Sequence, residues 1–292
     1  MNKDESQILK GVFILLMLFL HLFNHINTNV DFCLYINDIP LLTILSRAAN
    51  PVSFFLIVSG YGLFITSNKN DKKHYSRILN LYINYWLISA IFLALAYFIC
   101  PGRYSYDVVS ILNNFTGLEV SYNHPMWFIL PFSIISLSYP LICKIIKHYN
   151  SILLISILFI LNIITSYKIS RYGYYNNLII NNLFLSFHLL FAFCTGAIMA
   201  KENIYSKLKN HFSTIKQRYY WNIILSGLIL LIVILQCIVN ISITNTFYSA
   251  AFIIFFILLN RNEICDKCLT FLGGAFHEHL DNTCFYIYIP FP

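Results

Sequence analysis

The side chains best suited to chemistry in this chain are a lysine and a histidine on its first apolar segment. Lys10 and His21, with ten residues between them, lie on or beside the stretch Ile8–Phe23. An ionisable side chain is costly in the hydrocarbon core of a membrane, and such residues often mark a functional site. Because imidazole exchanges protons near neutral pH, His21 is a candidate general base. A histidine that only packs between helices, or lies at the membrane interface, explains the position equally well.

The composition indicates which elements must position these side chains. Of the 292 residues, 58% are hydrophobic and 11% are charged, whereas soluble domains carry roughly 25% charged residues. We therefore expect an all-α polytopic membrane protein. Stretches of about 20 apolar residues predict about eight spans, near residues 8–26, 41–66, 78–99, 126–146, 151–167, 183–200, 221–240 and 247–260. The net charge of +7 arises from basic residues between these spans, so we expect no nucleic-acid partner.

Lysine and arginine are concentrated in alternate connections between the spans. The connections at 27–40, 100–125, 168–182 and 241–246 carry few of them. The positive-inside rule then places the N-terminus in the cytoplasm, in a multi-pass protein of the cell's inner (cytoplasmic) membrane. At 1.5 Å per residue, His21 lies roughly 16 Å along the helix from Lys10, towards the outer surface. His25 follows one turn later on the same face.

The cysteines do not form a recognisable metal-binding pattern. Cys265 and Cys268 make a lone CxxC motif, and the other cysteines are scattered within or beside the spans. A zinc site needs further ligands at suitable spacing. We therefore expect no metal site and treat the cysteines as small apolar residues.

A series of motifs, in order and spacing, resembles the acyltransferase-3 family of integral membrane O-acyltransferases. These motifs are Lys10-(ten residues)-His21, the aromatic-rich run into Ser59-Gly60-Tyr61, the basic segment Lys72–Arg77 that leads to Tyr85-Trp86, the run Tyr122–Phe128, and the glycine-containing helix end Phe193–Lys201. The family more usually has arginine where this chain has Lys10, and Arg-x-x-Arg where this chain has Arg77 and Asn80. The resemblance extends from residue 8 to about residue 273.

The resemblance implies a membrane O-acyltransferase, most simply an O-acetyltransferase. Its donor would be cytoplasmic acetyl-CoA or another acyl-CoA, used as a substrate with no bound cofactor. His21 would act as the general base, or else as a transient acyl carrier. Lys10, Lys73 and Arg77 would bind the donor phosphates, although each lysine also fits the role of a topology determinant.

The acceptor implied by the resemblance is a hydroxyl group of a cell-surface polysaccharide or of its lipid-linked precursor. His25 and Trp127 would lie on the acceptor side, where an interfacial polar residue and a belt tryptophan are the alternatives. A transporter or flippase of such a precursor, or a membrane scaffold, would use the same spans without this chemistry. Membrane lipid is an expected partner, and the sequence leaves the oligomeric state open.

The end of the chain departs from the family pattern after Gly273. Leu272-Gly273 begins the motif of the family's final helix, but a polar string follows it. Permitted codons for residues 274–284, read one base later, encode E-H-S-M-N-I-W-I-I-H, which resembles the expected apolar continuation. We therefore predict a frameshift that leaves 1–273 as the acyltransferase-3-like membrane domain and 274–292 as an out-of-frame tail in place of the final helix or helices. Resequencing across this codon tests the prediction.

Overall fold

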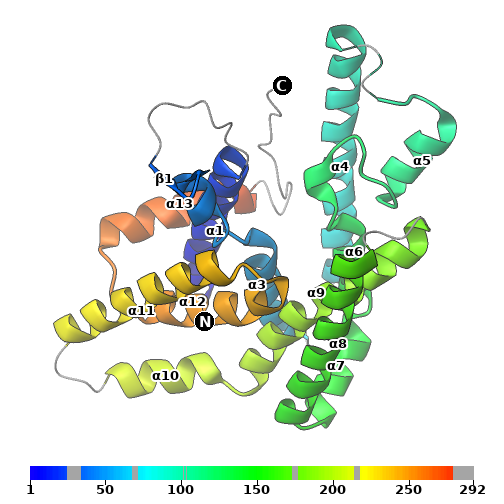
Figure 1. Ribbon diagram of the computed structural model, residues 1–292. Helices are drawn as coiled ribbons and strands as arrows, with labels where there is room; N and C mark the ends of the chain where they lie inside the picture. Colours follow the sequence, from blue (N-terminus) through cyan, green and yellow to red (C-terminus); the bar gives the residue numbers. More distant parts are fainter. Residues whose placement is uncertain are drawn as a thin grey trace.

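The computed structural model describes residues 1–24, 34–67, 72–100, 102, 104–172, 177–213 and 218–278. Helices make up nearly all of this part of the chain, and a two-stranded antiparallel hairpin joins the first two spans (Figure 1). The elements are α1 (Lys3–Phe23), β1 (Tyr35–Ile36), β2 (Ile39–Pro40), α2 (Leu41–Ser46), α3 (Pro51–Thr66), α4 (Lys72–Ile99), α5 (Val108–Thr116), η1 (His124–Met126), α6 (Ile129–Leu137), α7 (Tyr139–His148), α8 (Ser151–Tyr172), α9 (Leu178–Lys201), α10 (Ile204–Ser213), α11 (Arg218–Val239), η2 (Ser242–Thr244), α12 (Asn245–Leu258) and α13 (Glu263–Glu278).

The helices confirm the predicted polytopic membrane fold. Within the described residues, six segments are long and apolar enough to cross a membrane: α1, the α2–α3 segment, α4, α8, α9 and α11. The eighth predicted span is present as a shorter apolar helix, Ser242–Leu258. The fourth is not one straight helix, because the axes of α6 and α7 differ by 57°. Pro140 lies in the first turn of α7 and has no N–H with which to continue the α6 hydrogen-bond ladder, which explains the bend.

Two glycines allow the backbones of α3 and α9 to touch in the core. A Cβ atom on Gly60 would lie 1.9 Å from the carbonyl oxygen of Phe193, and one on Gly196 would lie 1.9 Å from that of Ile57. α9 also packs against α6, α7 and α8, so it is the central helix of the bundle (Figure 1). The glycines of two motifs noted in the sequence thus form the two sides of one helix crossing.

α1 is fixed at both ends and along its length. Asn2 and Glu5 form a capping box, so the helix begins at Lys3, before the apolar stretch. Near its middle, α1 meets α13 through glycine: a Cβ on Gly11 would lie 2.3 Å from the carbonyl oxygen of Leu269. A Cβ on Gly273 would lie 1.9 Å from the Gln7 carbonyl oxygen. α13 continues to Glu278; residues 279–292, which hold most of the predicted out-of-frame tail, lie outside the described residues.

α4 carries α5 beside it through three aromatic side chains (Figure 1). Tyr85 donates to the carbonyl of Asn114 at 2.8 Å, Trp86 to that of Phe115 at 2.8 Å, and Tyr82 to that of Thr116 at 3.1 Å. These bonds supply side-chain donors to carbonyl groups in the last turn of α5, where the backbone partners four residues ahead are absent. They fix the end of α5, from which the chain leads into the segment that contains Trp127.

Candidate active site

A cavity of about 800 Å³ runs along α1. Its walls come from α1, α3, α4 and the segment between Asn123 and Ser136. The lining includes both Met1 and His21, so the cavity follows nearly the whole length of α1. Protein cavities that hold small ligands and cofactors have volumes of roughly 300–1,000 Å³. This cavity is therefore large enough for an extended small molecule.

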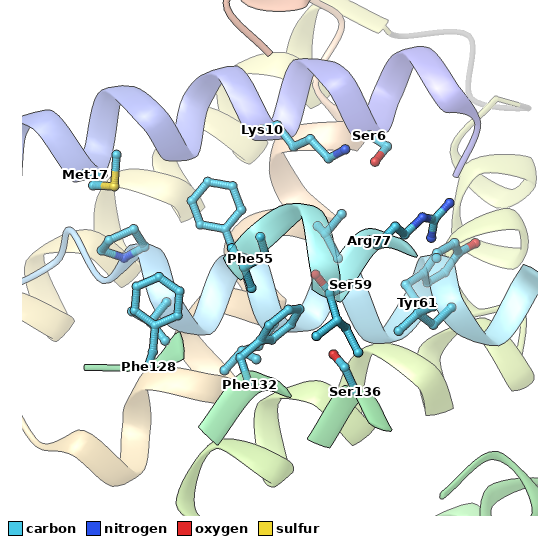
Figure 2. Close-up of a pocket in the computed structure, with 18 of the residues that line it drawn as sticks. Ser6, Lys10, Met17, Phe55, Ser59, Tyr61, Arg77, Phe128, Phe132 and Ser136 are labelled. Atoms are coloured by element: carbon cyan, nitrogen blue, oxygen red, sulfur yellow. The ribbon is translucent and has the colours of Figure 1, made fainter. Parts of the chain in front are cut away.

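Basic side chains from two helices lie at one end of the cavity. Figure 2 shows Lys10 and Ser6 on α1, and Arg77 reaching from α4 towards the region of Tyr61. Arg77 is exposed and Lys10 is half-buried. A lysine provides a compact positive charge, and a guanidinium binds phosphate oxygens in bidentate fashion. This end can therefore hold a polyanionic group.

α1 and α3 run in opposite directions along the cavity, which defines its other end. The ring of Phe13 stacks on that of Phe54 with centroids 4.8 Å apart. At the C-terminal end of α1, the Thr43 hydroxyl donates to the carbonyl of Phe23 at 2.9 Å and holds α2 against the last turn of α1. The N-terminal end of α3 therefore points along α1 towards His21, and α2 contacts the last turn of α1 itself.

His21 and Trp127 line the cavity together with this end of α3. His21 is half-buried in the last turn of α1. Trp127 follows η1 directly, and its ring meets Phe128 edge-on with centroids 6.2 Å apart. Because Lys10 lies roughly 16 Å from His21 along the helix, a ligand must be extended to contact both.

Aromatic side chains line the part of the cavity between its two polar ends. Figure 2 shows Phe55 from α3 and Phe132 from α6 pointing into the space below α1, with Phe128 below Met17. Ser59 lies nearer to Tyr61 and Arg77. Apolar walls exclude water, which strengthens electrostatic interactions within a site. The middle of the cavity can thus shield a reactive group on its way between the two ends.

An ion pair fastens α10 to the beginning of α1 at the basic end. Lys209 donates to Glu5 at 2.8 Å, and the Tyr205 hydroxyl donates to the same carboxylate oxygen. Burial, followed by the neighbouring Glu5 carboxylate, raises the pKa of Tyr205 well above its usual value. The phenol therefore stays protonated and keeps its bond to Glu5, which holds the helix start that lines the cavity.

Most of the predicted site residues meet in this cavity. Lys10, His21, Arg77 and Trp127 all line it, although they come from three separate parts of the chain. Lys73 lies in the first turn of α4, but its side chain is not among those described. His25 lies outside the described residues. The roles of all six residues remain predictions.

Sequence reasoning missed the aromatic middle of the cavity and two amides at its His21 end. Phe55 and Phe128 belong to the quoted motifs, but their apolar type alone indicates core packing. Asn50 and Asn123 line the cavity as well, and an asparagine before a helix ordinarily indicates only an N-cap. No group of three or more histidine, cysteine or acidic side chains is placed to bind a metal in the part of the chain that the structure describes.

Comparison with known proteins identifies the family of the chain. The sequence model of an acyltransferase domain, acyltransferase-3, matches residues 4–276. No curated protein and no solved structure matches the chain. The match covers nearly the whole cavity-forming part of the protein, including the helices that carry Lys10, His21, Arg77 and Trp127. The protein is therefore a multi-pass membrane acyltransferase and belongs to the acyltransferase-3 family.

Proposed function

We propose that the protein transfers an acyl group, in the simplest case acetyl, from acyl-CoA to a hydroxyl group of a cell-surface polysaccharide or of its lipid-linked precursor. The observation that carries the proposal is the single cavity that joins Lys10 and Arg77 to His21. A phosphate-binding end and a proton-accepting end are what an acyl-CoA-dependent transfer to a hydroxyl requires. The aromatic middle supports the same assignment, because an acyl thioester must be kept from water until the acceptor attacks.

The donor would bind from the cytoplasmic side, where we expect the N-terminus from the distribution of lysine and arginine. Arg77 binds phosphate oxygens, and Lys10 adds a positive charge deeper along α1. The pantetheine arm of the donor lies between the aromatic side chains and brings the thioester towards His21. This arrangement accounts for the separation of roughly 16 Å between Lys10 and His21.

The transfer requires one proton acceptor beside the acceptor hydroxyl. A ring nitrogen of His21 takes the hydroxyl proton as the oxygen attacks the thioester carbonyl carbon. The new C–O bond gives a tetrahedral intermediate, and its collapse breaks the C–S bond. The thiolate of coenzyme A leaves and takes up the proton held by His21. The products are the ester of the acceptor and free coenzyme A, and His21 is neutral again.

The experiment measures transfer from radiolabelled acetyl-CoA to surface polysaccharide that mild base has first de-esterified. The protein is reconstituted in liposomes, and base-labile label on the polysaccharide is counted. We expect His21→Ala to lower the rate by roughly 10² or more, the usual contribution of a general base. His148→Gln, on an exposed histidine at the end of α7 and outside the cavity lining, is the matched control. Transfer by His21→Ala at the wild-type rate would contradict the role of His21.

A further inference from the structure

Asparagine or aspartate precedes several helices of this protein, and most of these side chains cap the helix that follows. The capping residues are Asn2 of α1, Asp107 of α5, Asn150 of α8, Asn177 of α9 and Asn262 of α13. In each case a side-chain oxygen accepts a hydrogen bond from a backbone N–H in the first turn. Capping is the usual reason for an asparagine at this position.

Asn50 and Asn123 do not follow this rule. Asn50 precedes α3 and Asn123 precedes η1, yet neither side chain makes a capping hydrogen bond. Their ψ angles are 78° and 76°, whereas ψ is 179° at Asn2 and 151° at Asp107. Among the described residues, neither carboxamide has a hydrogen-bond partner. A carboxamide offers two donors and an acceptor with two lone pairs, so both keep their full capacity for a ligand.

Asn203, which precedes α10, also makes no capping hydrogen bond within the described part of the chain, but it is exposed and lies outside the cavity lining. Asn50 and Asn123 both line the cavity, on the side towards His21. Asn50 is at the N-terminal end of α3, the end of that helix that points along α1 towards His21. Asn123 begins the segment that continues through Trp127 to α6, whose far end carries Ser136. In Figure 2 this segment runs from Phe128, below Met17, through Phe132 to Ser136, below Ser59, so it begins on the side of the cavity away from Arg77. Two amides from separate segments thus line the cavity on the side that contains His21.

The chemistry of this end fits a ligand rich in hydroxyl groups. Each hydroxyl both donates and accepts, and so does each carboxamide. Carboxamides are uncharged, so they bind a neutral polyol without the attraction for anions that Lys10 and Arg77 provide at the other end. A cavity for small molecules commonly combines apolar walls with a few polar groups that fix the orientation of the ligand.

We propose that Asn50 and Asn123 hydrogen-bond to sugar hydroxyl groups of the acyl acceptor and select the hydroxyl that is presented to His21. The inference rests on the proposed function and names residues that bind its acceptor. It separates the two ends of the cavity by chemistry: cations hold the donor, and neutral amides hold the acceptor.

The test measures KM for de-esterified surface polysaccharide and KM for acetyl-CoA in reconstituted Asn50→Ala and Asn123→Ala. We expect KM for the polysaccharide to rise about 3- to 10-fold in each variant, the effect of one lost hydrogen bond. KM for acetyl-CoA should stay within about twofold of wild type. Asn50→Asp and Asn123→Asp keep the side-chain shape and lose the N–H donors, so KM for the polysaccharide should rise in them as well. They replace an alanine variant that folds poorly.

Asn177→Ala provides the matched control. Asn177 is exposed at the start of α9, outside the cavity lining, and accepts bonds from the N–H groups of Ile179 and Ile180. Its replacement should lower the thermal midpoint and leave both KM values unchanged. Asn50→Ala removes no capping bond, so its thermal midpoint should stay near that of wild type. The two variants thus separate helix capping from ligand binding.

The possible results separate the two proposals. If wild type esterifies the polysaccharide and all four Asn50 and Asn123 variants keep its KM, the acceptor-binding role is overturned and the proposed function stands. A rise confined to KM for acetyl-CoA also overturns the acceptor-binding role. If wild type hydrolyses or binds acetyl-CoA but forms no ester on the polysaccharide, the proposed acceptor class is overturned, and the present inference fails with it.

Discussion

The glycine crossing of α3 and α9 should be sensitive to a single methyl group. In Gly60→Ala the new Cβ would lie 1.9 Å from the Phe193 carbonyl oxygen, whereas close carbon–oxygen contacts in proteins are about 3.3 Å. The helices must therefore move apart by roughly 1.4 Å, the difference between these distances. A radial gap of 0.5–1 Å already forfeits a quarter to a half of the dispersion energy of the atoms that face it.

The residues that lose contact are fully packed, which sets the size of the effect. Phe54, Phe193 and Ala197 are 0% exposed and Ile57 is 2% exposed. Overpacking of such a core costs about 1–3 kcal/mol, and we expect Gly60→Ala and Gly196→Ala each to fall in this range. Because one separation of the helices accommodates both methyl groups, the double variant should cost little more than the worse single variant. Its two substitutions would then be strongly non-additive.

The assay is reversible unfolding of the purified protein in mixed micelles with increasing sodium dodecyl sulfate. Gly62→Ala is the matched control, because it lies on the same helix and its Cβ would meet no atom within 4 Å. That substitution should be neutral, or stabilising by about 0.5–1 kcal/mol from the helix propensity of alanine. Equal effects at Gly60 and Gly62, or strict additivity of Gly60→Ala and Gly196→Ala, would refute the proposed backbone contact.

Three further predictions concern charges outside the apolar core. Arg77→Ala should raise KM for acetyl-CoA about tenfold, as expected for the loss of a charge-assisted hydrogen bond. Arg77→Lys, which keeps the charge, should raise this KM less. Titration of acetyl-CoA at saturating polysaccharide measures KM in both variants. Bonds from neighbouring serine groups lower the pKa of Asp107 to about 2, below its ordinary 3.8, so its stabilisation of α5 is present above pH 4 and is lost as the pH falls towards 2. The protection factors of the amide hydrogens in α5 should therefore fall over that interval in wild type but not in Asp107→Asn. Glu5→Gln should loosen α10 and speed tryptic cleavage after Lys209, whereas an unchanged cleavage rate would show that the ion pair does not hold the helix.

The membrane fold could be predicted from composition, and the residues that meet in the cavity could be singled out by their resemblance to the motifs of the acyltransferase-3 family. Hydropathy alone locates spans because each must satisfy its own backbone in lipid, and the interval between Lys10 and His21 converts directly into distance along a helix. The bend between α6 and α7 was missed because an apolar run has no feature at Ser138 that interrupts it. The bend depends on Pro140, whose effect on the helix is local.

Other features depend on contacts between residues far apart in the chain. Gly60 and Gly196 belong to different motifs, and only their meeting in one helix crossing explains why each position lacks a side chain. Asn50 and Asn123 resemble ordinary N-caps in the sequence, and their distinction lies in backbone angles and in the cavity that they face. Glu5 contacts side chains of α10 that are far from it in the sequence, and no periodicity predicts that contact.

The three bonds from α4 to the end of α5 have a consequence for the way ligands reach the cavity. They make α4, α5 and the chain that follows one mechanical unit, whereas α1 and α3 are tied to α13 and α9 by glycine contacts. One wall of the cavity, α1 and α3, is thus packed closely on neighbouring helices. The other wall, α4, is bonded most strongly to its own neighbour in the chain, α5. A movement of the α4–α5 unit relative to α1 would change the width of the cavity, whereas Lys10 and His21, which lie on one helix, would keep their separation.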